Sequence, residues 1–176
     1  MAKTVEVRAL ERDDDRTAFS CGQRDLDRFF QHYAGQNQFK LHLATTYVAV
    51  IDSGIVGFAT VTAASLGREH IPDDRHRRHL PAYPLPVLRL ARLGVDVRAQ
   101  RLGIGTALLR YVFALALGQR DRVGCVGIVT DAKPEAVGFY ESLGFVELAG
   151  VQEGLLHGEP TPMFLTIATV AAAVEG

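Results

Sequence analysis

Residues 95–109 have the composition of an anion-binding loop that leads into a helix. The segment joins an apolar run to an amphipathic one, and its glycines at positions 103 and 105 leave the backbone free to approach a ligand closely. The unpaired amides of the first helical turn would point outward at the positive end of the helix dipole, which is a phosphate-binding arrangement. Arg98 and Arg101 would add charge-assisted contacts at the same rim.

Two common phosphate-binding motifs do not fit this loop. No Gly-Lys-Ser/Thr follows the glycines, as a P-loop requires, and Leu108 stands where the dinucleotide fingerprint GxGxxG needs its third glycine. A structural alternative stays open, in which Gly103 and Gly105 only ease the packing of the helix against a sheet.

Cysteine and histidine residues do not form a pattern of metal ligands or of a nucleophilic site. Cys21 and Cys125 are far apart and lack CxxC spacing, so we expect ordinary packing for both and no disulfide. His76 and His79 have no third ligand at zinc-finger spacing. We predict no metal site.

The composition is typical of one globular domain. The chain has 176 residues, of which 48% are hydrophobic and 22% charged, and nothing divides it, so we expect a single domain over residues 1–176. Its start does not resemble a signal peptide, and no run of ~20 apolar residues could span a bilayer. We therefore expect a cytoplasmic protein without a membrane partner. The net charge of −1 gives no overall reason to expect nucleic-acid binding, although a local patch could provide one.

Hydrophobic periodicity predicts strands that alternate with helices. Strands are expected near residues 5–10, 46–51, 55–61, 86–95, 125–129, 144–147 and 163–167, and helices from near residue 20, over residues 103–117 and from Pro134. Asp52-Ser53-Gly54 is typical of a hairpin turn. Residues 67–86 indicate a loop with a short helix near 73–79, and residues 168–174 a strand end with a frayed tail. This pattern predicts a mixed sheet with helices on both faces, in the α/β or α+β class.

The first predicted helix has the sequence of an amphipathic element. Ser20 and Gln23 have the spacing of a capping box at its start. The expected core face consists of Leu26, Phe29, Phe30 and Tyr33, and the opposite face carries Arg24, Asp27 and Arg28.

Two motifs in order resemble those of the GNAT N-acetyltransferases, which bind acetyl-coenzyme A. Leu93-Gly94-Val95-Asp96, followed by Gln100, Gly103 and Gly105, is similar to the pyrophosphate-binding motif of that family. The run AVGFYESLGF at residues 136–145 resembles the family's A-x-x-FY-x-x-x-GF signature. One departure is Arg101, where many members have glycine. Because backbone amides can still serve, we expect cofactor binding to survive.

The resemblance implies the GNAT fold, with the cofactor wedged between two splayed parallel strands. Free amides around Leu93 and Val95 would bind the pantetheine arm and polarise the thioester carbonyl, as an oxyanion site does. Tyr140 matches the tyrosine that protonates the departing thiolate. An alternative for Tyr140 is a ring packed beside Phe139 and Phe145 with its hydroxyl at the surface. The implied cofactor-binding residues are Leu93, Val95, Arg98, Gln100, Arg101, Leu102, Gly103, Ile104, Gly105, Thr106 and Phe139. No residue is marked as the general base.

Parts of the N-terminal half resemble the GNAT toxins of bacterial toxin–antitoxin pairs. Residues 19–22, 26–29 and 34–38 carry this similarity, as does Asp131-Ala132-Lys133, where other family members often have asparagine at the position of Lys133. Such toxins acetylate the free amine of aminoacyl-tRNA and stop translation. The resemblance implies a ribbon-helix-helix antitoxin as a partner and a homodimer.

An arginine-rich stretch offers an independent reason to expect RNA. Between Arg68 and Arg101 there are eight arginines and four acids, a local net charge of +4, and arginine suits phosphate because its planar fork can donate two bonds. The RNA-binding candidates are Arg75, Arg77, Arg78, Arg89 and Arg92. Alternatively, these residues solvate a loop or contact the cofactor phosphates.

Two other functions are compatible with the sequence. The first is an acetyltransferase for a small amine or a protein N-terminus, with the arginine loop as a lid. The second is a regulator that binds acetyl-CoA without catalysis. The first predicts that tRNA is neither bound nor modified, and the second predicts that no product forms.

Overall fold

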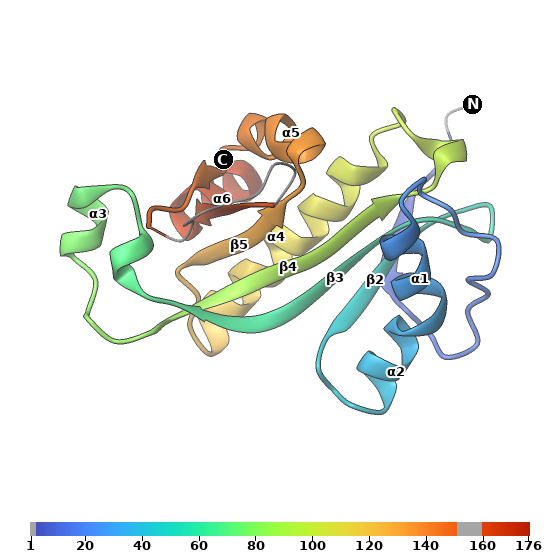
Figure 1. The fold of residues 1–176 in the computed structure, drawn as a ribbon, viewed down its shortest axis with the longest axis horizontal. Coiled ribbons are helices and arrows are strands. Elements are labelled where there is room, and N and C mark those ends of the chain that lie inside the picture. The colour runs from blue at the N-terminus through green and yellow to red at the C-terminus, as the bar shows by residue number, and fades with distance from the viewer. Residues whose placement is uncertain (1–2, 151–159) are drawn as a thin grey trace. The chain divides into compact units, whose positions relative to one another are not determined.

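The computed structural model describes residues 3–150 and 160–176 and divides the chain into two compact units. Unit 1 contains residues 1–62 and 90–112, and unit 2 contains residues 63–89 and 113–176. The elements labelled in Figure 1 and the short ones between them are β1 (Glu6–Ala9), α1 (Arg24–His32), α2 (Ala34–Phe39), β2 (Thr45–Ile51), β3 (Gly54–Leu66), η1 (Arg68–His70), α3 (Asp74–Arg78), β4 (Leu85–Val95), η2 (Val97–Ala99), α4 (Ile104–Arg122), β5 (Gly127–Ala132), η3 (Pro134–Ala136), α5 (Val137–Ser142), β6 (Val146–Glu147), β7 (Thr161–Thr166) and α6 (Ile167–Glu175).

The strands of the described residues form a seven-stranded sheet in the order β1-β2-β3-β4-β5-β7-β6. The helix α4 connects the neighbours β4 and β5, and a helical crossover is the usual connection between parallel strands. Antiparallel pairing joins β1 with β2, β2 with β3, β5 with β7, and β6 with β7. The expected mixed sheet is therefore confirmed.

In unit 1 the predicted hairpin is present, and its turn has the expected chemistry. Asp52 and Ser53 both adopt positive φ angles, 49° and 67°, as a two-residue type I′ turn requires. The turn fixes a register in which Ile51 pairs with Gly54 and Val48 with Phe58.

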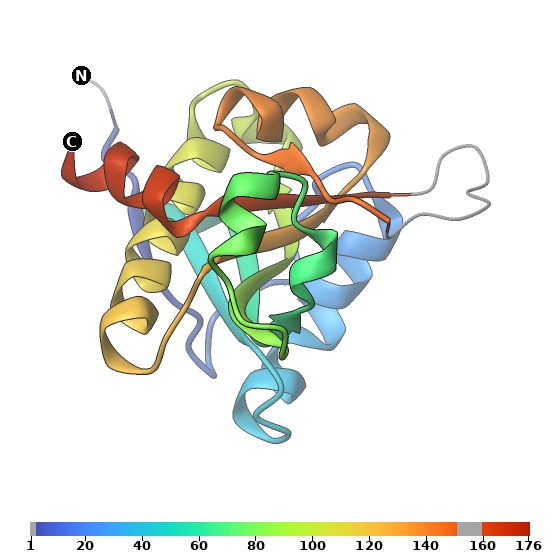
Figure 2. The same cartoon turned by 90° about the vertical axis from the view of Figure 1, so that its left-hand side faces the viewer.

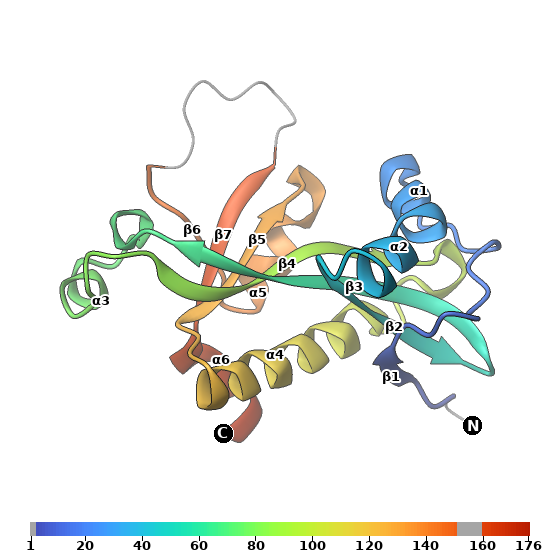
Figure 3. The same cartoon turned by 90° about the horizontal axis from the view of Figure 1, so that it is seen from below.

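The two faces of β3 in unit 1 pack against different helices. The Phe58 ring stacks on that of Phe30 of α1, with ring centroids 4.4 Å apart. On the other face, a Cβ at Gly57 would lie 2.8 Å from Cγ2 of Ile104 and 3.1 Å from Cδ1 of Leu108, so only glycine lets α4 begin this close to the strand. Figure 3 shows α1 and the start of α4 on opposite sides of β3.

The first helix begins later and ends earlier than its sequence pattern predicts. It starts at Arg24, with Gln23 at the N-cap and no side-chain cap, so the capping box expected at Ser20 is wrong. The Ser20 hydroxyl lies 3.3 Å from Asp27 Oδ2 instead. The helix α1 ends before Tyr33, and α2 begins directly after it. Tyr33 is 42% exposed, so the core position predicted for it is wrong.

Unit 2 has a core of its own around β5 and β7. Leu66, Ile71, Val87, Val129 and Phe164 are buried together there. The expected short helix is present as α3, capped by Asp73, which accepts hydrogen bonds from the amides of Arg75 and His76. It lies beside η1 (Figure 2).

Two segments of the chain are more helical than predicted. The helix α4 continues to Arg122. Residues 168–174 belong to the helix α6, so the frayed tail is wrong. Here the Thr166 hydroxyl caps the helix by accepting from the Thr169 amide, and alanine is the strongest helix former. Within residues 3–150 and 160–176, no helix is both long enough and apolar enough to cross a membrane.

Candidate active site

The loop after β4 is held by one buried carboxylate. Asp96 is completely buried and accepts hydrogen bonds from the amides of Ser20 (3.2 Å) and Arg98 (2.9 Å). It also accepts two bonds of 2.9 Å from the Arg98 guanidinium. The bond from Arg98 is the main reason that the pKa of Asp96 is lowered, against the effect of desolvation. Asp96 thus joins the loop to the segment before α1 as a permanent anion.

Two further contacts fix the same loop within unit 1. The Val97 amide donates to the Ser20 carbonyl over 2.8 Å. The Gln100 side chain donates to the carbonyls of Cys21 (3.4 Å) and Val95 (3.3 Å). Arg98 and Gln100, both expected at the cofactor, therefore have structural bonds within the protein as well.

The backbone of the predicted phosphate loop turns sharply before α4. Arg101 has a φ of 66° and Gly103 a φ of 79°. The Ala107 amide donates to the Gly103 carbonyl, so the amides of Ile104, Gly105 and Thr106 form the first turn, where helix geometry provides no partner. A Cβ at Gly103 would meet no atom within 4 Å. The helix start is therefore open on this side, as a cradle for a phosphate group must be.

Tyr140 of α5 is buried inside unit 2 and is only 5% exposed. Its ring packs edge-on against Phe139 and Phe145, with centroids 5.3 Å and 5.2 Å away. Burial raises the pKa of Tyr140 to about 12, and a hydrogen bond with the Thr130 side chain acts in the opposite direction. The alternative of a surface hydroxyl is wrong, because the hydroxyl meets a side chain that is itself 4% exposed.

The five arginines expected at RNA differ in what they contact. Arg77 donates to the Ile71 carbonyl over 2.7 Å and pairs with Asp74. Arg89 forms an ion pair with Asp131. Arg75 and Arg78 are exposed on α3, where the Arg78 guanidinium also donates to the Asp74 carbonyl over 3.3 Å, and Arg92 lies in unit 1.

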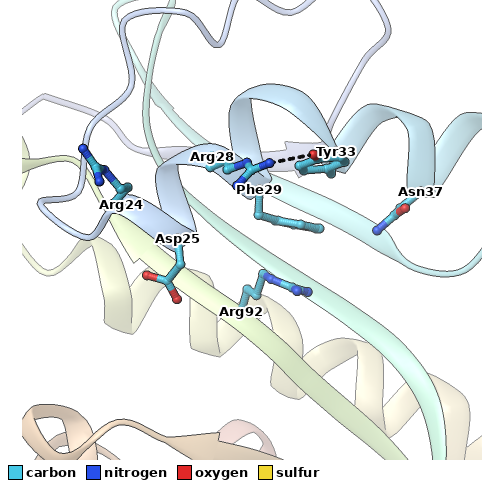
Figure 4. Close-up of a pocket in the computed structure, with 7 residues that line it drawn as sticks. All are labelled: Arg24, Asp25, Arg28, Phe29, Tyr33, Asn37 and Arg92. Atoms are coloured by element: carbon cyan, nitrogen blue, oxygen red, sulfur yellow. Dashed lines mark hydrogen bonds between the residues drawn. The ribbon is translucent and has the colours of Figure 1, made fainter.

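A pocket of about 710 Å³ opens in unit 1 between α1 and β4 (Figure 4). The Arg92 guanidinium lies 3.9 Å from the centroid of the Phe29 ring, and Arg28 donates to the Tyr33 hydroxyl over 3.3 Å. The pocket is lined by Arg24, Asp25, Arg28, Phe29, Tyr33, Asn37 and Arg92. The sequence marks Arg92 as an RNA-binding candidate but does not predict the pocket as a site. The other signal in the sequence is the pair of arginines four residues apart, Arg24 and Arg28, on the predicted polar face of α1.

No group of three or more histidine, cysteine, aspartate or glutamate side chains is arranged to hold a metal ion in the part of the chain that the structure describes. Cys21 and Cys125 are both buried thiols.

Comparison with known proteins identifies the family. Residues 42–147, more than half of the chain, match the model of the acetyltransferase (GNAT) domain. The chain belongs to the GNAT acetyltransferase family. The matched segment includes both the loop before α4 and Tyr140, so the two GNAT motifs expected from the sequence lie inside the domain.

This chain is similar to one curated GNAT relative and two solved GNAT structures. A tRNA-acetylating toxin of Mycobacterium tuberculosis is 33% identical over 75% of this chain and 78% of its own length. The structure of AtaT complexed with acetyl-methionyl-tRNAfMet has a TM-score of 0.86 at 21% identity, covering 97% of this chain and 99% of that one. A variant of the toxin AtaT bound to the C-terminus of the antitoxin AtaR and acetyl-CoA has a TM-score of 0.78 at 21% identity, covering 98% and 99%. The similarity to these two structures confirms the GNAT fold.

Proposed function

We propose that this GNAT protein transfers the acetyl group of acetyl-CoA to the free α-amine of aminoacyl-tRNA and acts as the toxin of a toxin–antitoxin pair. The observation that carries the proposal is the match to a tRNA-acetylating toxin over three quarters of the chain. The arginine-lined pocket of unit 1 supports a polyanionic acceptor independently of that match.

The loop before α4 suits the pyrophosphate of acetyl-CoA. Its open cradle at Gly103 and the amides of Ile104, Gly105 and Thr106 offer hydrogen bonds to phosphate oxygens at the positive end of a long helix. Exposed Arg101 and Leu102 stand at the rim of this loop. Leu93 and Val95 of β4 would supply amides to the pantetheine arm, and Phe139 a contact from α5.

Acetyl-CoA supplies a thioester whose carbonyl carbon is open to a neutral amine. In the transfer, the amine nitrogen bonds to that carbon, the C–S bond breaks with its electron pair on sulfur, and the nitrogen loses a proton. We assign the donation of a proton to sulfur to Tyr140. With a pKa of about 12 its hydroxyl is fully protonated at neutral pH, and the proton that leaves the nitrogen balances the one that Tyr140 gives to sulfur.

The partners of the proposed toxin follow from the same proposal. An aminoacyl-tRNA is the acceptor, a ribbon-helix-helix antitoxin is the protein that silences the toxin, and two copies of the chain form a homodimer. Arg75 and Arg78 are the arginines of α3 that are exposed for contact with RNA phosphates.

The test is to incubate the purified protein with radiolabelled acetyl-CoA and total aminoacylated bacterial tRNA, and to follow label into acid-precipitable, RNase-sensitive material. We expect label with aminoacylated tRNA and none with deacylated tRNA. Tyr140→Phe keeps the buried ring and removes the proton donor, so transfer should fall by ~10²–10⁴-fold. The exposed Tyr83→Phe is the matched control and should label normally.

Each result of this assay has a defined meaning. Unchanged labelling by Tyr140→Phe would contradict the assignment of the proton donor. Complete absence of label from the unaltered protein, with acetyl-CoA binding confirmed by calorimetry, would contradict the tRNA acceptor and favour a small amine or a protein N-terminus.

A further inference from the structure

The pocket between α1 and β4 has an excess of positive charge. Of its charged lining residues, Arg24, Arg28 and Arg92 are cationic, and Asp25 is the one acid. The remaining polar groups that face it are the Tyr33 hydroxyl, which already accepts from Arg28, and the neutral amide of Asn37 from α2. These groups come from every element that lines the pocket: α1, the turn at Tyr33, α2 and β4.

Arg92 is the arginine of the pocket that packs on an apolar ring, while the residue as a whole is exposed. Its guanidinium stacks on the Phe29 ring, which is 5% exposed, and burial lowers the pKa of Arg92 while the charge of Asp25 acts in the opposite direction. An arginine remains charged at any physiological pH even so. The Phe29 ring covers one face of this exposed guanidinium, so its charge acts on the pocket with less screening than that of a fully solvated arginine.

The place of Arg92 in β4 relates this charge to the transfer step. Arg92 immediately precedes Leu93, whose amide the proposed function assigns to the acetylated arm of acetyl-CoA, and both residues belong to unit 1. An acceptor amine held in this pocket therefore lies near the Arg92 guanidinium, one residue along β4 from that amide.

We propose that this pocket receives the amine end of the acceptor and that Arg92 keeps the amine in its neutral, nucleophilic form. The inference rests on the proposed function. A nearby positive charge disfavours an ammonium ion and lowers its pKa, so the ammonium releases its proton to water on binding, and the lone pair is free to attack the thioester carbon. The protein then needs no side chain as a general base. The same field disfavours aminoacyl groups whose own side chains are cationic.

The test compares the pH dependence of two rate constants for one neutral aminoacyl-tRNA. The profile of kcat/KM reports the pKa of the free acceptor amine, and the single-turnover rate at saturation reports its pKa in the complex. We expect the second pKa to lie below the first in the unaltered protein. Arg92→Met retains a long side chain over Phe29 but not the charge. It should raise the pKa of the acceptor amine in the complex by about one unit.

Two control variants separate the charge of Arg92 from its packing. Arg92→Lys restores a cation and should return the pKa of the complex toward that of the unaltered protein. Arg110→Met removes an exposed arginine of α4 that is not among the lining residues, and should leave both profiles unchanged.

The choice of acceptor gives a second readout. It compares the acetylation of lysyl-tRNA with that of tRNA charged with norleucine, a neutral analogue of lysine of similar length. The unaltered protein should prefer the neutral acceptor by roughly tenfold, the effect of one pKa unit, and Arg92→Met should reduce that preference.

Equal pKa values in the two profiles, or no change with Arg92→Met, would overturn the inference even if aminoacyl-tRNA is acetylated efficiently. A change only in the salt dependence of KM would likewise overturn it and make Arg92 a phosphate contact. No acetylated product from the unaltered protein at any pH would instead refute the proposed function.

Discussion

Arg101 occupies a backbone conformation that its side chain disfavours. Its φ of 66° is in the left-handed region, where a residue with a Cβ costs about 1–2 kcal/mol, and GNAT proteins often have glycine at this place in the motif. A strained arginine at the rim of a phosphate cradle suggests that its charge compensates by contacting the cofactor.

Replacement of this arginine should therefore affect stability and binding in opposite directions. Arg101→Gly relieves the strain but adds freedom to the unfolded chain, so the free energy of unfolding should rise by about 0.5–1 kcal/mol. Acetyl-CoA affinity, measured by calorimetry, should fall by roughly tenfold as a charged contact is lost. Arg101→Ala is the matched control: it loses the contact and keeps the strain, so affinity should fall without the gain in stability. Undiminished affinity in both variants would show that Arg101 does not touch the phosphates.

Asp96 shows why a neighbouring position is hard to interpret from sequence. The motif includes Asp96 after Val95 but gives it no role, whereas the structure shows that its buried carboxylate joins Ser20 to Arg98. That partnership spans 76 positions along the chain, and no local pattern encodes it. The same carboxylate explains why Arg98, placed at the cofactor because of its charge, also has a structural partner.

At the scale of elements, the arginines of α3 have two different roles: one stabilises the loop, and two are exposed to a partner. Arg77 holds the Ile71 carbonyl and Asp74, and so closes the turn on itself. Arg75 and Arg78 are exposed on the same short helix. Clustering in the sequence could not distinguish these roles, because all three arginines lie within four positions.

The three arginines should respond differently to neutralisation. Arg75→Gln with Arg78→Gln should weaken tRNA binding and reduce the slope of log affinity against log salt by about 1.5, because two phosphate contacts are lost. Acetyl-CoA affinity should not change. Arg77→Gln should instead lower the free energy of unfolding by about 1 kcal/mol, the net contribution of a typical intramolecular hydrogen bond. The double variant Arg110→Gln with Arg122→Gln removes the same charge from α4 and serves as the control; if it flattens the salt slope equally, α3 is not the RNA contact.

How much of each element the sequence reveals depends on where its stabilising contacts lie. The hairpin and the start of α4 are predictable because Asp52-Ser53-Gly54 and Gly103 determine them locally. The break at Tyr33 is not, because nothing in the spacing of α1 ends the helix there. The GNAT signature predicts Tyr140 and the loop, whereas the pocket stays hidden until the fold brings Arg92 of β4 over Phe29 of α1.

The two units of the chain are expected to unfold as one domain. Strands β3 and β4 and the helix α4 run from one unit into the other without a linker, so neither unit can lose these elements alone. We therefore propose that residues 1–176 behave as a single cooperative domain and show one transition in calorimetry and in circular dichroism.

Alkaline pH provides a probe of that cooperativity, because each unit contains a buried group whose pKa is raised. Burial raises the pKa of Cys21 in unit 1 from 9.0 to about 11, and that of Tyr140 in unit 2 from 10.0 to about 12. Both groups stay neutral longer in the folded chain than in the unfolded chain. Their contribution to stability is therefore complete below pH 9 and 10 respectively, and is lost as the pH rises through the folded values.

Stability measured by urea unfolding should thus fall between pH 9 and 12, with Tyr140 accounting for a loss of about 2 kcal/mol by the top of that range. Tyr140→Phe and Cys21→Ala, kept under reducing conditions, should each flatten the fall, whereas the exposed Tyr83→Phe should not. If the units unfold together, either variant changes the pH dependence of the one transition. Two transitions, with Cys21→Ala affecting only one of them and Tyr140→Phe only the other, would show that the units are separate domains despite their shared strands.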